Sequence, residues 1–214
     1  MIAIAGFGLQ QANAVTMFTS SLNQGNSAIS GFAGPYGNVT IVLTSSTTAT
    51  VAFTGNTVAG NTYLFGATGA VALDVNATTF SVSNIMGTNS GTGFTPGPFT
   101  VGSGQESSFG MFNLVIDSFD GTGHASSIIM FTLTNTSGTW GSPAAVLAFN
   151  SNGFDAAAHI FVMTAPANAS NSALATGFAG EGTGTPTVPD GGTTVMLLGA
   201  ALGALGMARR FLMS

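Results

Sequence analysis

The densest group of side chains that could do chemistry is Asp117, Asp120 and His124, which lie within eight residues directly after an apolar run. The segment places two carboxylates on a glycine-rich turn, and hard oxygen ligands of this kind suit Ca²⁺. The EF-hand pattern is not met, because no ligand run continues to a bidentate glutamate. A turn stabilised by its aspartate side chains would use the same residues. Asp117 and Asp120 are therefore candidate calcium ligands, and we expect no other cofactor.

Two histidines, His124 and His159, could serve a Ser-His-Asp hydrolase, because serine and aspartate are both present. The sequence contains no G-x-S-x-G elbow, and His159 lies in a strand-like run where packing is the simpler role. A hydrolase would require a cleft that joins a serine, one histidine and an aspartate. We expect no enzymatic activity and assign no catalytic residue.

The single tryptophan, Trp140, is a candidate sugar-stacking residue. A flat aromatic ring suits the apolar face of a pyranose, and Tyr36 and Tyr63 could extend such a platform. The alternative is that Trp140 follows its Thr-Ser-Gly-Thr turn into the core and fills it. The sequence leaves both interpretations open.

Charge is scarce and unevenly placed. Only 4% of residues are charged, against about 25% in an ordinary domain. Residues 15–187 contain six acidic residues and no Lys or Arg, which gives this region a formal charge of −6. A nucleic-acid partner is excluded, because phosphate contacts need Lys and Arg. The chain has no cysteine, which rules out disulfides, cysteine-ligated zinc and thiol catalysis.

These side chains must be positioned by short strands. Runs with period-2 alternation, typical of half-buried antiparallel strands, occupy residues 38–44, 48–54, 69–75, 78–84, 111–117, 127–135 and 158–163. Residues 44–47 are expected to form a hairpin turn, and residues 143–147 either one helical turn or a short strand. Residues 15–37 and 84–108 are expected to be loops. We predict one all-β domain over residues 15–164, an antiparallel β-sandwich of jelly-roll or immunoglobulin-like type.

The segments that flank this domain differ in composition from it. Residues 1–14 end in Ala12-Asn13-Ala14, small residues that match the cleavage pattern of a secretory signal. The positive n-region is missing, so we interpret residues 1–14 as a signal-peptide remnant, with an apolar first strand as the alternative. Residues 165–187 are rich in Ala, Gly, Thr and Pro and are expected to be a flexible linker.

Residues 188–214 have a three-part pattern: a Pro/Gly break, an uncharged apolar run and the only two basic residues of the chain. The 16 residues from Thr193 to Ala208 would span roughly 24 Å as a helix, short of the ~30 Å hydrocarbon core. This predicts a marginal transmembrane helix with Arg209 and Arg210 on the cytoplasmic side. A buried core helix is the alternative.

This tail resembles that of PEP-CTERM exported bacterial proteins. The matching positions are Val188, Pro189, Asp190, Gly191 and Gly192, with Arg209 and Arg210. The family's naming motif has Glu-Pro where this chain has Asp190-Gly191, so the tail is a variant form and the cleaved bond stays open. The resemblance implies recognition by exosortase, a membrane-embedded cysteine protease or transpeptidase. It also implies export from a Gram-negative bacterium and only transient anchoring in the inner membrane.

The sequence thus favours an exported, exosortase-processed, non-catalytic protein of the cell surface or extracellular matrix, associated with exopolysaccharide. The alternative is a carbohydrate-binding module, with or without calcium, and a hydrolase is the third class. The ligand, the oligomeric state and the fate of the mature protein are left open at this point.

Overall fold

The computed structural model describes residues 17–181 of the 214-residue chain. The signal-peptide remnant, the expected transmembrane helix and the sorting residues Val188 to Gly192, Arg209 and Arg210 all lie outside the described residues. Within residues 17–181, no helix is long and apolar enough to cross a membrane.

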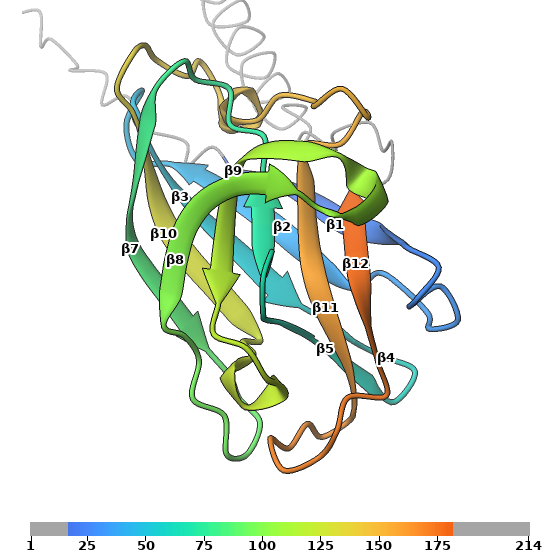
Figure 1. Cartoon of the computed structure of the whole chain (residues 1–214). Coiled ribbons are helices and arrows are strands. Elements are labelled where there is room, and N and C mark those ends of the chain that lie inside the picture. Colours follow the sequence, from blue (N-terminus) through green and yellow to red (C-terminus); the bar gives the residue numbers. More distant parts are fainter. Residues whose placement is uncertain (1–16, 182–214) are drawn as a thin grey trace, which may run out of the picture.

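The described residues form twelve strands and three short 3₁₀ helices (Figure 1). The strands are β1 (Met17–Gly25), β2 (Gly37–Leu43), β3 (Thr48–Gly55), β4 (Thr57–Val58), β5 (Asn61–Phe65), β6 (Val71–Leu73), β7 (Phe80–Thr88), β8 (Phe99–Gln105), β9 (Met111–Ser118), β10 (Ile128–Asn135), β11 (Ala156–Thr164) and β12 (Ala175–Glu181). The 3₁₀ helices are η1 (Ser107–Phe109), η2 (Thr122–His124) and η3 (Pro143–Val146).

All the strands belong to one antiparallel sheet with the order β7-β10-β3-β2-β1-β12-β11-β6-β9-β8, and β5 pairs with β11 and β4. The sheet twists and curls until its two edges approach each other (Figure 1). A Cβ atom at Gly87 of β7 would lie 2.5 Å from the ring of Phe99 on β8. The all-β antiparallel prediction is confirmed. The structure differs from the predicted sandwich in having one nearly closed sheet instead of two packed sheets.

The predicted runs correspond to β2, β3, β6, β7, β9, β10 and β11. The hairpin turn at residues 44–47 joins β2 to β3, where the Thr44 N–H donates to the Thr48 carbonyl at 2.9 Å. Of the two alternatives for residues 143–147, the structure has the helical turn, η3, with the Ser142 hydroxyl as its N-cap. The alternation of apolar and polar residues in the sequence therefore predicted strands that place large side chains on the inner face of the sheet.

Strands β1, β4, β5, β8 and β12 were not predicted, and the loops expected at residues 15–37 and 84–108 are wrong over β1, the end of β7 and β8. Strand β12 lies within the predicted linker at residues 165–187, so that prediction is wrong over residues 175–181. This strand pairs with both β1 and β11 in the middle of the sheet. Its glycines allow close packing: a Cβ at Gly180 would lie 2.5 Å from the Phe109 ring, and one at Gly177 would lie 2.9 Å from Ile29. The glycines of β12 are therefore explained by the close packing of other side chains against this strand, and not by the flexibility of a linker.

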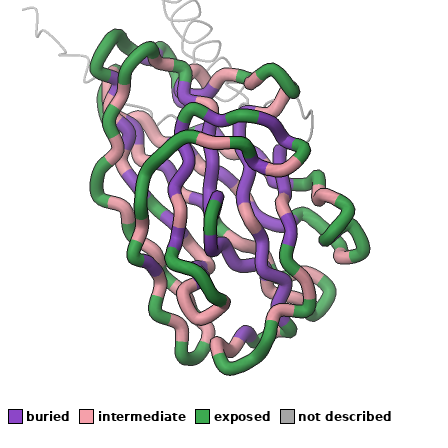
Figure 2. Tube along the Cα trace, viewed as in Figure 1, coloured by how far each residue is buried: buried purple, intermediate pink, exposed green. Residues whose placement is uncertain are grey.

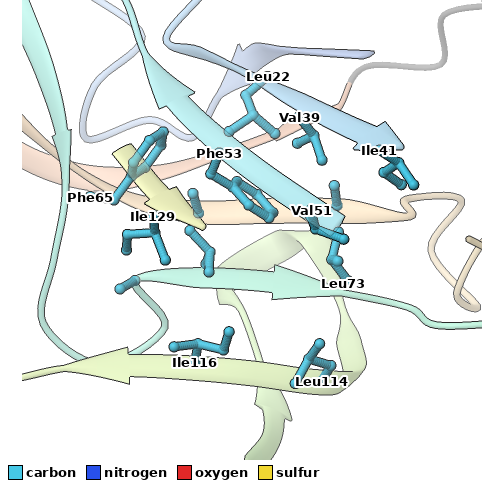
Figure 3. Packing of buried hydrophobic residues seen from close by; sticks show 14 of the residues in the cluster. Leu22, Val39, Ile41, Val51, Phe53, Phe65, Leu73, Leu114, Ile116 and Ile129 are labelled. Carbon is cyan, nitrogen blue, oxygen red and sulfur yellow. The ribbon is translucent and has the colours of Figure 1, made fainter. Parts of the chain in front are cut away.

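The core fills the interior of the curled sheet (Figure 2). Val51 and Phe53 of β3 face Leu73 of β6 and Leu114 and Ile116 of β9 across it (Figure 3). The Phe53 ring is fully buried and packs edge-on against Phe65 at 6.0 Å and parallel to Phe131 at 6.5 Å. The Phe53–Phe65 contact joins β3 to β5 in the other half of the sheet, and the Phe53–Phe131 contact joins the neighbouring strands β3 and β10.

The two halves of the sheet differ on their outer faces. Two smaller buried clusters cover the half that contains β11, one around Phe161 and Met163 and one around Phe109 and Phe112. Among the described residues, no buried cluster covers the outer face of β1, β2, β3, β10 and β7. One outer face is therefore capped by loops and the other is open.

The substitution Phe53→Ala should lower the free energy of unfolding by about 3–5 kcal/mol, because it removes a buried ring and leaves a cavity. Phe149→Ala is the matched control: its ring is 60% exposed, and we expect a change within about 0.5 kcal/mol. Urea denaturation followed by far-ultraviolet circular dichroism measures both. Equal effects of the two substitutions would contradict the packing described above.

Candidate functional site

The predicted calcium ligands are not brought together as a metal site. Asp117 Oδ1 accepts the N–H of Gly69 at 2.7 Å, which ties β9 to the turn before β6. Asp120 is exposed on the following loop. Within residues 17–181, no three Asp, Glu, His or Cys side chains gather in a way that could hold a metal ion. Through its bond to Gly69, Asp117 stabilises the turn before β6, 48 residues away in the sequence, and not the turn that follows β9, which was the alternative to calcium.

Among residues 17–181, both histidine rings bond to backbone carbonyls. The ring of His124 bonds through Nδ1 to the Thr95 carbonyl at 2.9 Å, and that of His159 to the Thr68 carbonyl at 3.1 Å. The His159 ring also stacks on Phe178 at 4.5 Å. In the part of the chain that the structure describes, neither ring bonds to a serine hydroxyl or a carboxylate. The arrangement that a Ser-His-Asp hydrolase needs is therefore missing there.

Trp140 is a core residue, so its predicted role in sugar stacking is wrong. Its side chain is 3% exposed, and its Nε1–H donates to the Asn76 carbonyl at 2.8 Å. Tyr36 and Tyr63 are also buried and pack edge-on against each other at 5.0 Å. None of these three rings offers a face to a ligand, because the curled sheet encloses them all.

A titratable cluster that the sequence did not indicate surrounds the turn at Gly69. Gly69 has φ +71°, and a Cβ at this position would overlap the carboxyl group of Glu106. Glu106 is 3% exposed, and burial, together with the nearby Asp117 carboxylate, raises its pKa to about 7. A carboxyl group that titrates near neutrality is suited to acid–base chemistry. Its burial leaves a substrate almost no access, so we assign it a structural role.

A second cluster, Ser20, Asp155 and Glu181, lies where β1, β11 and β12 meet. Glu181 pairs with Leu22 of β1, two residues from Ser20. Burial and the adjacent Asp155 carboxyl raise the pKa of Glu181 to about 9, and burial also raises the pKa of Asp155. Both carboxyls are more than nine-tenths buried, and no Lys or Arg is present in residues 15–187 to neutralise them. The pair therefore retains a proton at neutral pH.

Two surface grooves contain no charged side chain. One of about 430 Å³ is lined by amides and hydroxyls that include Asn76, Asn135, Ser137 and Thr139. The other, about 440 Å³, lies between the β4–β5 hairpin and the segments at residues 89–91 and 165–167. Neutral hydrogen-bonding groups at both places suit an uncharged polar ligand.

The comparisons with known proteins address the tail. Residues 187–211 match the family model described as the VPDSG-CTERM motif. The pentapeptide Val188 to Gly192 differs from that motif's name only at Gly191, which stands in place of serine. This is a PEP-CTERM-like sorting motif, so the resemblance is confirmed, and the match supports an exported protein that is targeted to exosortase and associates with the membrane. Searches of curated proteins and of solved structures found no match.

The stability of the domain should fall as the pH rises from about 5 to about 9. A glutamate in the unfolded chain titrates near pH 4.3, whereas Glu106 titrates at about 7 and Glu181 at about 9 in the folded domain. The folded state therefore binds more protons over this range, and each group contributes at most about 1.4 kcal/mol per pH unit. Thermal unfolding at a series of pH values measures this slope.

The substitutions Glu106→Gln and Glu181→Gln should flatten this pH dependence, because an amide keeps the shape of the protonated carboxyl group and does not titrate. Asp120→Asn is the control, since Asp120 is exposed. A stability that rises with pH, or one that falls equally in both Gln variants and the native chain, would contradict the assignment.

Proposed function

We propose that this protein is a non-catalytic component of the cell surface or extracellular matrix, exported and then separated from its tail by exosortase. The observation that carries the proposal is the sorting motif at residues 187–211, directly behind a folded domain. Only residues 182–186 separate the end of β12 from the motif. Processing within the motif would leave the sheet intact and remove both arginines, Arg209 and Arg210.

The surface chemistry of the domain supports a place among hydrated polymers. Residues 17–181 contain no Lys or Arg, and the exposed strand positions carry mainly Ser, Thr, Asn and Gly. Such a surface exchanges hydrogen bonds with neutral hydroxyl groups, and it has no cationic groups that would bind polyanions. An exopolysaccharide matrix is an environment of this kind.

The arrangement of the strands also suits display at a surface. Strand β12 ends beside β1, near the start of the described chain. The loops at residues 56–60, 89–98, 119–127 and 165–174 lie at the opposite end of the sheet (Figure 1). A chain that is held through its C-terminal end would therefore direct these loops away from the attachment point.

A carbohydrate-binding module is the second candidate. The two charge-free grooves favour it, because their walls carry amides, hydroxyls and backbone groups but no ionisable side chain. The burial of Trp140 means that recognition would depend on hydrogen bonds and aliphatic contacts and not on aromatic stacking.

Intact-mass spectrometry of the protein from hosts with and without exosortase tests the sorting proposal. We expect loss of the segment containing Arg209 and Arg210 only in the host that has the enzyme. The double substitution Arg209→Ala/Arg210→Ala should increase the unprocessed fraction, because it removes the cytoplasmic anchor of the tail. Asn168→Ala, in the loop at residues 165–174, is the control. An intact C-terminus in both hosts would refute the proposal.

A further inference from the structure

We propose that the open outer face of β1, β2, β3, β10 and β7 binds a neutral polysaccharide that lies flat on the sheet. The proposal rests on the proposed function as an exported matrix protein, and it assigns the surface and the chemical class of the partner. The central part of this surface, which we call the hydroxyl grid, consists of Thr48, Thr50, Thr132, Thr134, Ser81 and Ser83.

The grid follows from strand register. Thr132 lies opposite Thr50 on one side and Ser83 on the other, and Thr134 lies between Thr48 and Ser81 in the same way. The six hydroxyls therefore form two rows across three strands. Neighbouring strands are ~4.8 Å apart, and side chains two positions apart along a strand are separated by ~6.8 Å. The result is a closely spaced array of donors and acceptors on the outer face of the curled sheet.

The hydroxyls of the grid are available to a ligand. In the described part of the chain none of the six makes a side-chain hydrogen bond, and none has a buried unpaired oxygen atom. Ser81 and Ser83 are exposed, and the four threonines are half-buried. Each hydroxyl can donate one hydrogen bond and accept two, which matches the hydroxyls of a sugar. The threonine methyl groups supply contacts for its C–H faces.

The surface extends beyond the grid in both directions. On β1 and β2, Thr19 faces Thr40 at 3.4 Å and the Ser21 hydroxyl donates to Asn38 at 2.8 Å. Farther along β10 and β7, Met130 pairs with Met86, and these side chains are 37% and 58% exposed. The face thus offers polar rows beside a small apolar patch over five adjacent strands, which suits an extended polymer more than a small molecule.

The distribution of charged residues on the domain indicates whether the open face binds an anionic or a neutral polymer. Every acidic residue among residues 17–181 lies outside β1, β2, β3, β7 and β10, on β9, on β12 or in the connecting segments. The open face therefore has no formal charge of either sign. A polyanion finds no cation on this face and meets exposed acidic side chains such as Asp120 elsewhere on the domain, so it is disfavoured. An uncharged polymer rich in hydroxyls loses no charge solvation on binding, which makes it the complementary partner.

Affinity electrophoresis of the full 214-residue chain tests the proposal, with dextran and soluble cellulose derivatives as neutral polymers and alginate as the anionic one. We expect retardation by at least one neutral polymer and none by alginate. The triple substitution Thr50→Val/Thr132→Val/Thr134→Val keeps the shape and strand preference of threonine but removes three hydroxyls. It should weaken binding on the order of tenfold.

The matched control is Thr57→Val/Thr62→Val, which removes two hydroxyls from the β4–β5 hairpin beside the 440 Å³ groove. Binding lost in this control but kept in the triple variant would overturn the proposal in favour of the groove. Failure of every neutral polymer to bind, or stronger binding of alginate, would also overturn it. Sedimentation that shows self-association in the native chain and its loss in the triple variant would identify a second copy as the occupant. The sorting proposal is tested separately by the mass of the C-terminus.

Discussion

Strand β12 joins the two halves of the sheet by pairing with β1 on one side and β11 on the other. These two ladders connect the half that contains β2, β3, β10 and β7 to the half that contains β6, β9 and β8, and a bridge between Phe65 and Ser126 adds a shorter link. Positions 177 and 180 of the strand are glycines because Ile29 and Phe109 pack directly against its backbone there. The last of the described strands is therefore also the one that joins the two halves through full ladders.

The lack of cations imposes a second constraint, since a buried carboxyl group in this domain has no Lys or Arg to pair with. Glu106, Asp155 and Glu181 are more than nine-tenths buried, and each has a raised pKa because burial favours the neutral form. A bound proton neutralises these carboxyl groups, whereas in other proteins a neighbouring arginine compensates their charge. The same scarcity of charged residues leaves the open outer face neutral. The protonated carboxyl groups in the interior and the uncharged outer face therefore both follow from the composition of the chain.

Sequence patterns predicted much of the strand inventory but not how the strands assemble. Strands such as β3 and β10 were found because large apolar residues alternate with threonine, for example around Phe53 and Phe131. Strand β12 escaped detection because Gly177 and Gly180 pack against Ile29 and Phe109, and these contacts cannot be read from local periodicity. Strand β8 escaped detection because most of its residues are exposed and it lacks an alternating apolar pattern. Glu181 and Asp155 interact although they lie 26 residues apart in the sequence, and the pairing of β11 with β12 brings them together, so neither residue carried a signal on its own. The identity of the tail, in contrast, depends on contiguous residues and was predicted correctly.

The absence of Lys and Arg from residues 15–187 affects how the protein can be detected and how well it resists proteolysis. Trypsin cleaves only after these two residues, so the folded domain is a single tryptic fragment too large for routine peptide sequencing. Amine-reactive dyes and aldehyde cross-linkers find no lysine on it either. A matrix built from such domains would be resistant to trypsin-like proteases from competing organisms and under-represented in surveys that rely on tryptic digestion.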